Sequence, residues 1–198
     1  MAKHTVQFYF DYNSPYSYFA SLLVEEVCRE GDAELEWLPM VIGGVFKEVG
    51  TEPPHTKPNR RNYMEQDLHD LAEYLGLPYK PRTEFLFHPI LSLRATLTVP
   101  NGPERTKAVH ALFRGAFAED LDLGEVDVVT RLLNEAGLDG AAMVAKTQDD
   151  AIKDELKQLT AKAVAAGGFG APTMIVDGKK MFWGQDRLPV LARYLKSH

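Results

Sequence analysis

Cysteine is almost absent from this sequence of 198 residues, which contains Cys28 alone. One cysteine excludes an internal disulfide, a C-x-x-C redox pair and a zinc site built from several cysteines. Cys28 falls late in an expected helix, on or near its apolar face, where a small buried thiol is the usual outcome. We therefore expect no cysteine nucleophile in this protein.

The sequence also lacks an excess of basic residues and any long hydrophobic run. Its formal net charge is -6 and its pI is about 5.5. A mildly acidic surface repels phosphate backbones and anionic headgroups. No segment has the length of a signal-peptide core or of a membrane span. These absences predict no nucleic-acid partner, no membrane partner and a cytoplasmic location for a chain of ordinary globular composition.

Metal and dinucleotide motifs are missing as well. The six histidines show no H-E-x-x-H pairing, and His69 and His110 fall within helical patterns, so we predict no metal site. Residues 167–170 (GGFG) have the composition of a phosphate loop, but they precede an expected strand. Because a dinucleotide-binding loop follows a strand, we do not interpret residues 167–170 as a phosphate-binding loop.

The first part of the chain has an α/β pattern. In residues 5–11, apolar side chains recur at every second position, which is the period of a strand. Ser14 and Pro15 then offer a helix cap and a first helical residue, and apolar residues follow at helical spacing up to Gly31. A second short strand is predicted over residues 34–38. The helix between the two strands predicts a β-α-β unit with parallel strands.

The rest of the chain changes character twice. The middle shows helical spacing and no convincing strand, with helices expected around residues 68–75, 109–117, 126–136 and 152–163. Strand character then returns at residues 173–176 and 180–183 on either side of an Asp-Gly turn, which is a hairpin signal, and a last helix begins near Asp186. This order predicts one α/β domain interrupted by a helical one.

Three loops are expected at one edge of the sheet, over residues 11–16, 168–173 and 183–187. Each has an ordinary explanation when taken alone. A serine before a proline is usually only a helix cap. A proline before a strand usually follows a trans bond, since only about 5% of X-Pro bonds in folded proteins are cis. An aspartate at a helix start usually complements the helix dipole.

Taken together, the loops carry three ordered motifs that resemble a known family. Residues 10–18 (FDYNSPYSY) look like the signature of the kappa-class glutathione transferases and bacterial 2-hydroxychromene-2-carboxylate isomerases. Residues 168–173 (GFGAPT) resemble the family's cis-proline loop. Residues 182–188 (FWGQDRL) resemble its glutathione-carboxylate motif, in the form typical of the isomerase branch. Residues 42–46 and 63–67 also agree, so the resemblance covers nearly the whole chain.

The resemblance implies a fold and an assembly. The fold class is α/β, with a thioredoxin-like domain (β-α-β … β-β-α) interrupted by an all-helical insertion domain. The thioredoxin-like domain comprises residues 1–57 and 166–198, and the insertion comprises residues 58–165. The family shares this fold with the periplasmic disulfide oxidases, and Ser14 stands where their first active cysteine would be. Because the resembling families are dimeric, a homodimer is expected.

The resemblance also implies glutathione as cofactor and assigns its binding residues. Ser14 is the catalytic residue, donating a hydrogen bond to the glutathione sulfur at a helix N-terminus, which lowers the thiol pKa. The Ala171-Pro172 bond is expected to be cis, so that backbone groups of Ala171 pair with the cysteinyl part of glutathione. Gln185 and Asp186 are expected to hold the γ-glutamyl end.

The implied reaction is isomerisation of a bicyclic aromatic carboxylic acid, in which the glutathione thiolate adds and then leaves. Phe46, Phe85 and Phe87 are expected to line an apolar pocket for this small aromatic substrate. Two alternatives stay open: a kappa-like glutathione transferase or peroxidase, which consumes the thiol, and a glutathione-binding protein without catalysis. Leu91 supports the last alternative, because the family often has asparagine at this position.

Overall fold

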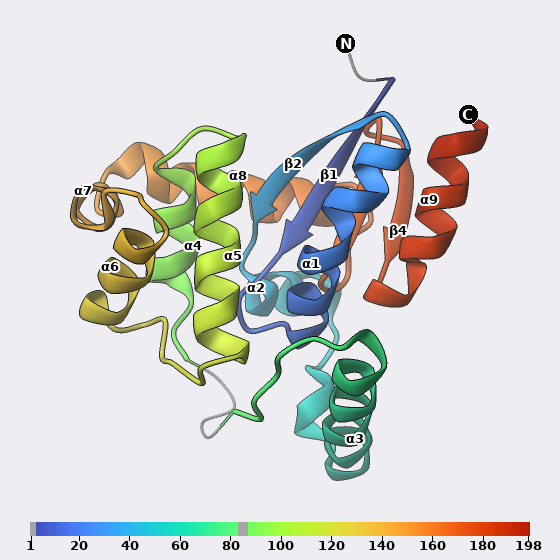
Figure 1. The fold of residues 1–198 in the computed structure, drawn as a ribbon, viewed down its shortest axis with the longest axis horizontal. Helices are drawn as coiled ribbons and strands as arrows, with labels where there is room; N and C mark the ends of the chain where they lie inside the picture. The colour runs from blue at the N-terminus through green and yellow to red at the C-terminus, as the bar shows by residue number, and fades with distance from the viewer. Residues whose placement is uncertain (1–2, 83–86) are drawn as a thin grey trace.

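A single four-stranded sheet forms the centre of a computed structural model of the chain, which describes residues 3–82 and 87–198 (Figure 1). The strand order is β2-β1-β3-β4. The strands are β1 (His4–Phe10), β2 (Ala33–Pro39), β3 (Thr173–Val176) and β4 (Lys180–Trp183). Strands β1 and β2 pair in parallel, and β3 pairs antiparallel with both β1 and β4. The four strands predicted from the sequence are confirmed.

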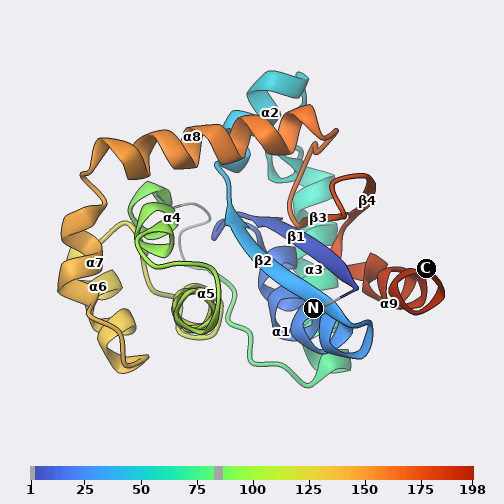
Figure 2. The ribbon, with the colours of Figure 1, turned by 90° about the horizontal axis from the view of Figure 1, so that it is seen from above.

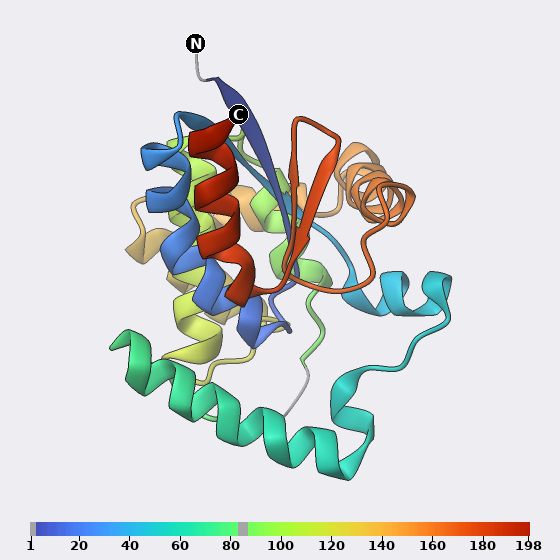
Figure 3. The ribbon, with the colours of Figure 1, turned by 90° about the vertical axis from the view of Figure 1, so that its right-hand side faces the viewer.

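Helices cover both faces of this sheet. Helix α1 (Pro15–Glu30) connects β1 to β2, and it packs against α9 (Leu188–Ser197), which follows a short 3-10 turn η2 (Gln185–Arg187). Figure 3 shows α1 and α9 next to each other on one side of the strands and α8 (Asp150–Ala165) on the other side. The sheet is thus the middle layer of three.

Helix α1 begins and ends where its sequence predicts. Ser14 is its N-cap, and its side chain accepts a hydrogen bond from the Ser17 N–H, while Pro15 occupies the first helical turn. At the other end, a Cβ on Gly31 would lie 2.6 Å from the Leu195 Cβ. Gly31 therefore ends α1 and also permits the close approach of α9.

The described residues between β2 and β3 form helices joined by loops and contain no strand. These helices are α2 (Ile42–Val49), η1 (Pro54–Thr56), α3 (Pro58–Leu75), α4 (Ile90–Leu97), α5 (Pro103–Phe117), α6 (Val126–Glu135) and α7 (Gly140–Lys146), followed by α8. The helices expected around residues 68–75, 109–117, 126–136 and 152–163 are confirmed as α3, α5, α6 and α8. The sequence prediction did not include α2, α4 and α7, each of eight residues or fewer.

Aromatic and polar contacts join the helical segment to the sheet. Trp37 on β2 packs edge-on against Phe8 and Phe10 of β1, and Phe10 also contacts Phe113 of α5. Buried Arg105 of α5 donates to the carbonyl of Trp37 over 3.2 Å. Helix α8 contacts β2 and α2 as well as α4. The boundaries of the insertion at residues 58 and 165 stay a prediction.

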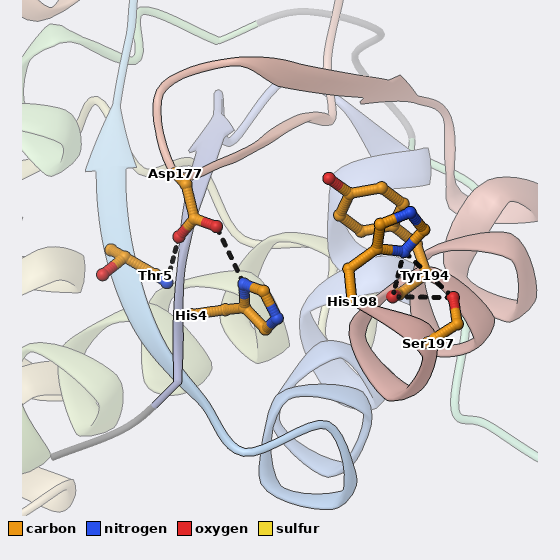
Figure 4. A network of polar contacts seen from close by, with 6 residues as sticks. All are labelled: His4, Thr5, Asp177, Tyr194, Ser197 and His198. Atoms are coloured by element: carbon orange, nitrogen blue, oxygen red, sulfur yellow. Dashed lines mark hydrogen bonds and ion pairs between the residues drawn. The ribbon is translucent and has the colours of Figure 1, made fainter.

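A polar network lies at the end of the sheet where β1 begins. There, Asp177 in the β3-β4 turn accepts a hydrogen bond from the Thr5 N–H and lies 2.8 Å from His4 Nδ1 (Figure 4). The hydrogen bond from the Thr5 N–H holds the pKa of Asp177 below its usual value, and the bond from His4 adds a smaller contribution in the same direction. This network fastens β1 to the hairpin, far from the opposite end, where β1 leads into Ser14.

Candidate functional site

Ser14 lies at the N-terminus of α1, where its hydroxyl both donates and accepts a hydrogen bond. Its Oγ accepts from the Ser17 N–H over 3.1 Å and donates to the Ala171 carbonyl over 3.0 Å. The residue is 3% exposed. The N–H of Tyr16, one of the first-turn donors that have no partner within a helix, makes no hydrogen bond to the described residues. The hydroxyl and the helix end are therefore placed together.

A buried carboxylate supports the loop that carries Ser14. Asp11 is fully buried, and its two carboxylate oxygens accept from the N–H groups of Asn13 and Ile42, each over 2.8 Å. Burial raises the pKa of Asp11 to about 6, although both hydrogen bonds act to lower it. Asp11 thus ties the Ser14 loop to the first turn of α2.

Asn13 makes a second connection to the same loop. Its side-chain amide donates to the Phe87 carbonyl over 3.1 Å and accepts from the Phe87 N–H over 3.3 Å. No role for Asp11 or Asn13 is predicted from the sequence. The signal available was an Asp-x-Asn-Ser turn directly after a strand, since such side chains often bond nearby backbone in turns. The partners Ile42 and Phe87 lie too far along the sequence to be inferred from it.

The proline loop lies directly against Ser14. The Ala171-Pro172 bond is cis, so the prediction of its geometry is confirmed. Thr173 Oγ1 donates to the Gly170 carbonyl over 2.7 Å. The Ala171 N–H has no hydrogen-bond partner among the residues that the structure describes. Ala171 therefore offers an unpaired donor beside a carbonyl that retains one lone pair after accepting from Ser14.

The third loop is hydrogen-bonded to the second. The Gly184 N–H donates to the Pro172 carbonyl over 3.0 Å, and Gly184 has a φ of 99°, a conformation that favours glycine. A Cβ on Gly184 would lie 2.6 Å from Asp186 Oδ1. The Asp186 side chain is 58% exposed and pairs with Arg187 over 3.2 Å, and Gln185 is half-buried. The predicted meeting of the three loops is confirmed, and the binding roles of Gln185 and Asp186 stay predictions.

The expected aromatic pocket is not evident in the two main cavities of the described residues. A small cavity of about 110 Å³ touches Asn13 and Pro15, and a larger one of about 740 Å³ lies between α2, α4 and α8. Neither is lined by Phe46, which is half-buried, or by Phe87, which is buried in the core. Phe85 lies outside the described residues. Their role in substrate binding stays a prediction.

Cys28 is buried and lies near the end of α1 that is opposite Ser14. Burial, and secondarily the charge of Glu25, raises the pKa of the Cys28 thiol to about 12, which removes its nucleophilic form at neutral pH. Among residues 3–82 and 87–198, no three His, Cys, Asp or Glu side chains are grouped to hold a metal ion. No described helix is long and apolar enough to cross a membrane.

These features define a class of protein: a thioredoxin-like fold with a cis-proline loop against the N-terminus of α1, and a serine at the position that faces this loop. The model of the DSBA-like thioredoxin domain matches residues 5–196, and the chain belongs to this family.

Within the family, the chain is similar to two groups of proteins. The chain is 29% identical to human glutathione S-transferase kappa 1, over 96% of this chain and 90% of that one. It is 26% identical to 2-hydroxychromene-2-carboxylate isomerase of Sphingobium xenophagum, over 96% and 97%. A solved structure of 2-hydroxychromene-2-carboxylate isomerase superposes with a TM-score of 0.87 at 21% identity, covering 96% of this chain and 94% of that one. The chain is thus related to both transferases and isomerases.

Proposed function

We propose that this protein is a glutathione-dependent isomerase that converts a bicyclic aromatic carboxylic acid of the 2-hydroxychromene-2-carboxylate type into a trans-o-hydroxybenzylidenepyruvate type of product. The observation that carries the proposal is the bond from Ser14 Oγ to the Ala171 carbonyl, which places a hydroxyl donor and a helix N-terminus beside the cis-proline loop. The isomerase relatives named above support the choice of reaction.

Ser14 serves in this proposal to stabilise the glutathione thiolate. A thiol with a pKa of about 8.5 is only a few per cent ionised at neutral pH. Lowering that pKa by about 2 units requires about 2.7 kcal/mol of stabilisation of the charged form. The Ser14 hydroxyl and the unpaired Tyr16 N–H at the start of α1 supply hydrogen bonds and a favourable dipole for this purpose.

The remaining glutathione contacts follow from the two neighbouring loops. The unpaired N–H and the carbonyl of Ala171, two residues before β3 begins, supply one donor and one acceptor for pairing with the cysteinyl main chain of the tripeptide. The bond from the Gly184 N–H to the Pro172 carbonyl holds this segment in place. Gln185 and the exposed carboxylate of Asp186 then bind the γ-glutamyl end, with Asp186 accepting from the ammonium group.

The chemistry regenerates glutathione. The thiolate forms a C–S bond with the far carbon of the ring C=C bond. The electron pair of that double bond shifts toward the hemiketal carbon and expels the ring oxygen as a phenolate, which leaves an enol and makes the former double bond single. After rotation about this single bond, the enol hydroxyl gives its proton to the phenolate and becomes the keto group, and the electron pair returns to restore the double bond and expel the thiolate. Glutathione is therefore a cofactor, and since it is an intracellular thiol of reducing compartments, a cytoplasmic location accompanies the proposal.

The second candidate is a kappa-like glutathione transferase or peroxidase, favoured by the identity to the human kappa enzyme. The third is a glutathione-binding protein without catalysis, favoured by Leu91. Mass spectrometry of glutathione after incubation with a chromene acid separates the three. The proposal predicts many turnovers of the acid with glutathione unchanged in mass. A conjugate or a disulfide would establish the second candidate, and glutathione binding without turnover of any substrate would establish the third.

A further inference from the structure

The larger cavity is lined by one cationic side chain, Arg94, that forms no ion pair with the described residues. Helix α8 forms one wall, with α4 toward its N-terminal end and α2 farther along, an arrangement that can be followed in Figure 2. Its volume of about 740 Å³ lies in the range of small-molecule sites. Arg94 of α4 lines it, and the Arg94 Nε is buried without a hydrogen-bond partner in the described residues.

An unpaired buried guanidinium nitrogen requires an explanation. Buried polar groups in native proteins are nearly always hydrogen-bonded, and a lone buried donor costs free energy. No ion pair of Arg94 is described within residues 3–82 and 87–198. The other cations on the cavity wall differ in this respect, because Lys153 pairs with Asp150 and Lys157 pairs with Asp154. A bound anionic ligand would therefore supply the hydrogen-bond partner that the buried Nε of Arg94 lacks.

The remaining walls define the rest of that ligand. Apolar side chains line the cavity from α4 and α8 and from the residue that caps α2, including Ile90, Leu156, Val164 and Val41. Glu48 is the one carboxylate on the wall, against Arg94 and the two lysines. An apolar cavity with a net positive lining suits a molecule that has a hydrophobic body and a single carboxylate, and the proposed function makes that body aromatic. The planar fork of arginine matches such a carboxylate through two parallel hydrogen bonds.

The cavity adjoins the candidate site through the first turn of α2. The N–H of Val41, a cavity residue, donates to Thr160 Oγ1 over 3.0 Å. The next N–H along the chain, that of Ile42, donates to the Asp11 carboxylate, which also holds the Ser14 loop. One turn of backbone thus contacts the cavity on one side and the support of the Ser14 loop on the other.

We propose that the cavity between α2, α4 and α8 binds an aromatic carboxylic acid, with Arg94 holding its carboxylate. The assignment of this acid as the substrate rests on the proposed function, whereas its binding does not require glutathione. The site differs from the pocket of Phe46, Phe85 and Phe87 that the sequence predicted. It selects for acids over neutral molecules of the same shape.

The test compares 2-naphthoate with the neutral 2-naphthamide by calorimetry in the absence of glutathione. The parent protein is expected to bind the acid at least about tenfold more tightly than the amide, as a hydrogen-bonded charge pair would give. Arg94→Met is expected to erase this preference. Lys157→Met removes a charge from the same cavity wall, and it is expected to change the affinity for the acid by no more than about twofold.

Two further measurements keep the inference separate from the proposed function. Glutathione at saturation is expected to leave naphthoate affinity unchanged, since the two ligands occupy different sites. If Arg94→Met does not fold, Arg94→Lys, which keeps the charge but loses the fork, is expected to weaken binding of the acid alone. Equal binding of acid and amide by the parent, no binding of the acid, or displacement of the acid by glutathione would overturn the inference. Absence of isomerase turnover with intact acid binding would instead overturn the proposed function.

Discussion

Ser14 Oγ donates a hydrogen bond to the Ala171 carbonyl over 3.0 Å, although 157 positions separate the two residues. A hydroxyl has a single proton, so this bond and a bond to a glutathione thiolate are alternatives. Under the proposed function we expect binding of the thiolate to rotate the hydroxyl from the Ala171 carbonyl to the sulfur. The Ala171 carbonyl is then expected to accept from the main chain of the same ligand.

Ser14→Ala is expected to affect both stability and catalysis. Loss of the cap acceptor for Ser17 and of the donor to Ala171 costs about 0.5 to 2 kcal/mol of stability. The pKa of bound glutathione, measured by thiolate absorbance against pH, is expected to rise. Turnover at neutral pH falls about tenfold for each 1.4 kcal/mol of transition-state stabilisation lost.

Ser17→Ala is the matched control for this prediction. Ser17 lies in the first turn of the same helix, is fully buried, and its hydroxyl has no hydrogen-bond partner among the described residues. Its replacement is expected to leave the thiolate titration and turnover unchanged. If Ser14→Ala binds glutathione, titrates like the parent and keeps full turnover, Ser14 is only a helix cap.

Asp186→Asn is expected to weaken glutathione binding by about 1 to 3 kcal/mol, the range for a hydrogen bond to a charged group. The fold is expected to survive, because the Asp186 side chain is 58% exposed. Isothermal calorimetry and a thermal melt measure the two quantities. Asp150→Asn is the control, since Asp150 is likewise an exposed carboxylate at a helix start. Equal affinity of Asp186→Asn and the parent would show that Asp186 only complements α9.

Local patterns predicted the elements whose signals lie close together in the sequence. The alternation in β1 and the Ser14-Pro15 cap of α1 are of this kind. Helix α4 was missed because its eight residues include apolar side chains on all sides and no side-chain cap. A short helix buried among α5, α7 and α8 depends on those contacts, which the sequence does not display.

The candidate site divides in the same way. The cis bond at Pro172 and the meeting of three loops followed from motifs with their own sequence signals. The burial of Asp11 depends on an N–H of Ile42, 31 positions later, and the environment of Arg94 depends on three helices packed around it. Residues far away in the sequence determine whether a polar side chain is exposed to solvent or hydrogen-bonded in the interior. The sequence without its fold does not identify these residues.

A homodimer is the expected assembly, because closed twofold pairing is common and the resembling families are dimeric. Light scattering at micromolar concentration is expected to give twice the mass of the 22.2 kDa chain. Dilution into the nanomolar range tests whether the association is obligate, and it serves as the internal control for aggregation. A single-chain mass throughout would remove the dimer from the proposal without affecting the site.

Asp11 is expected to give the protein a stability component that decreases as pH rises. Its folded pKa is about 6 against an ordinary value of 3.8, so the folded state holds the proton more tightly than the unfolded chain. The contribution is fully present below the unfolded pKa and is lost as pH rises through the folded pKa. About two pKa units correspond to about 3 kcal/mol. Asp11→Asn cannot titrate, so the stability lost by this variant relative to the parent is expected to shrink by that amount between about pH 3 and about pH 7.

Asp177→Asn is the control for Asp11, because the two aspartates have folded pKa values shifted in opposite directions. The bonds from Thr5 and His4 lower the pKa of Asp177, so its contribution is present above the unfolded pKa and is lost as pH falls through the folded one. The stability lost by Asp177→Asn is therefore expected to grow as pH rises to about 4 and then to level off, whereas that lost by Asp11→Asn shrinks as pH rises further. Urea titrations across the pH range measure both, and carbon NMR of the Asp11 carboxyl in the parent reports its pKa directly. Slopes of the same sign for the two variants would contradict the burial argument for Asp11.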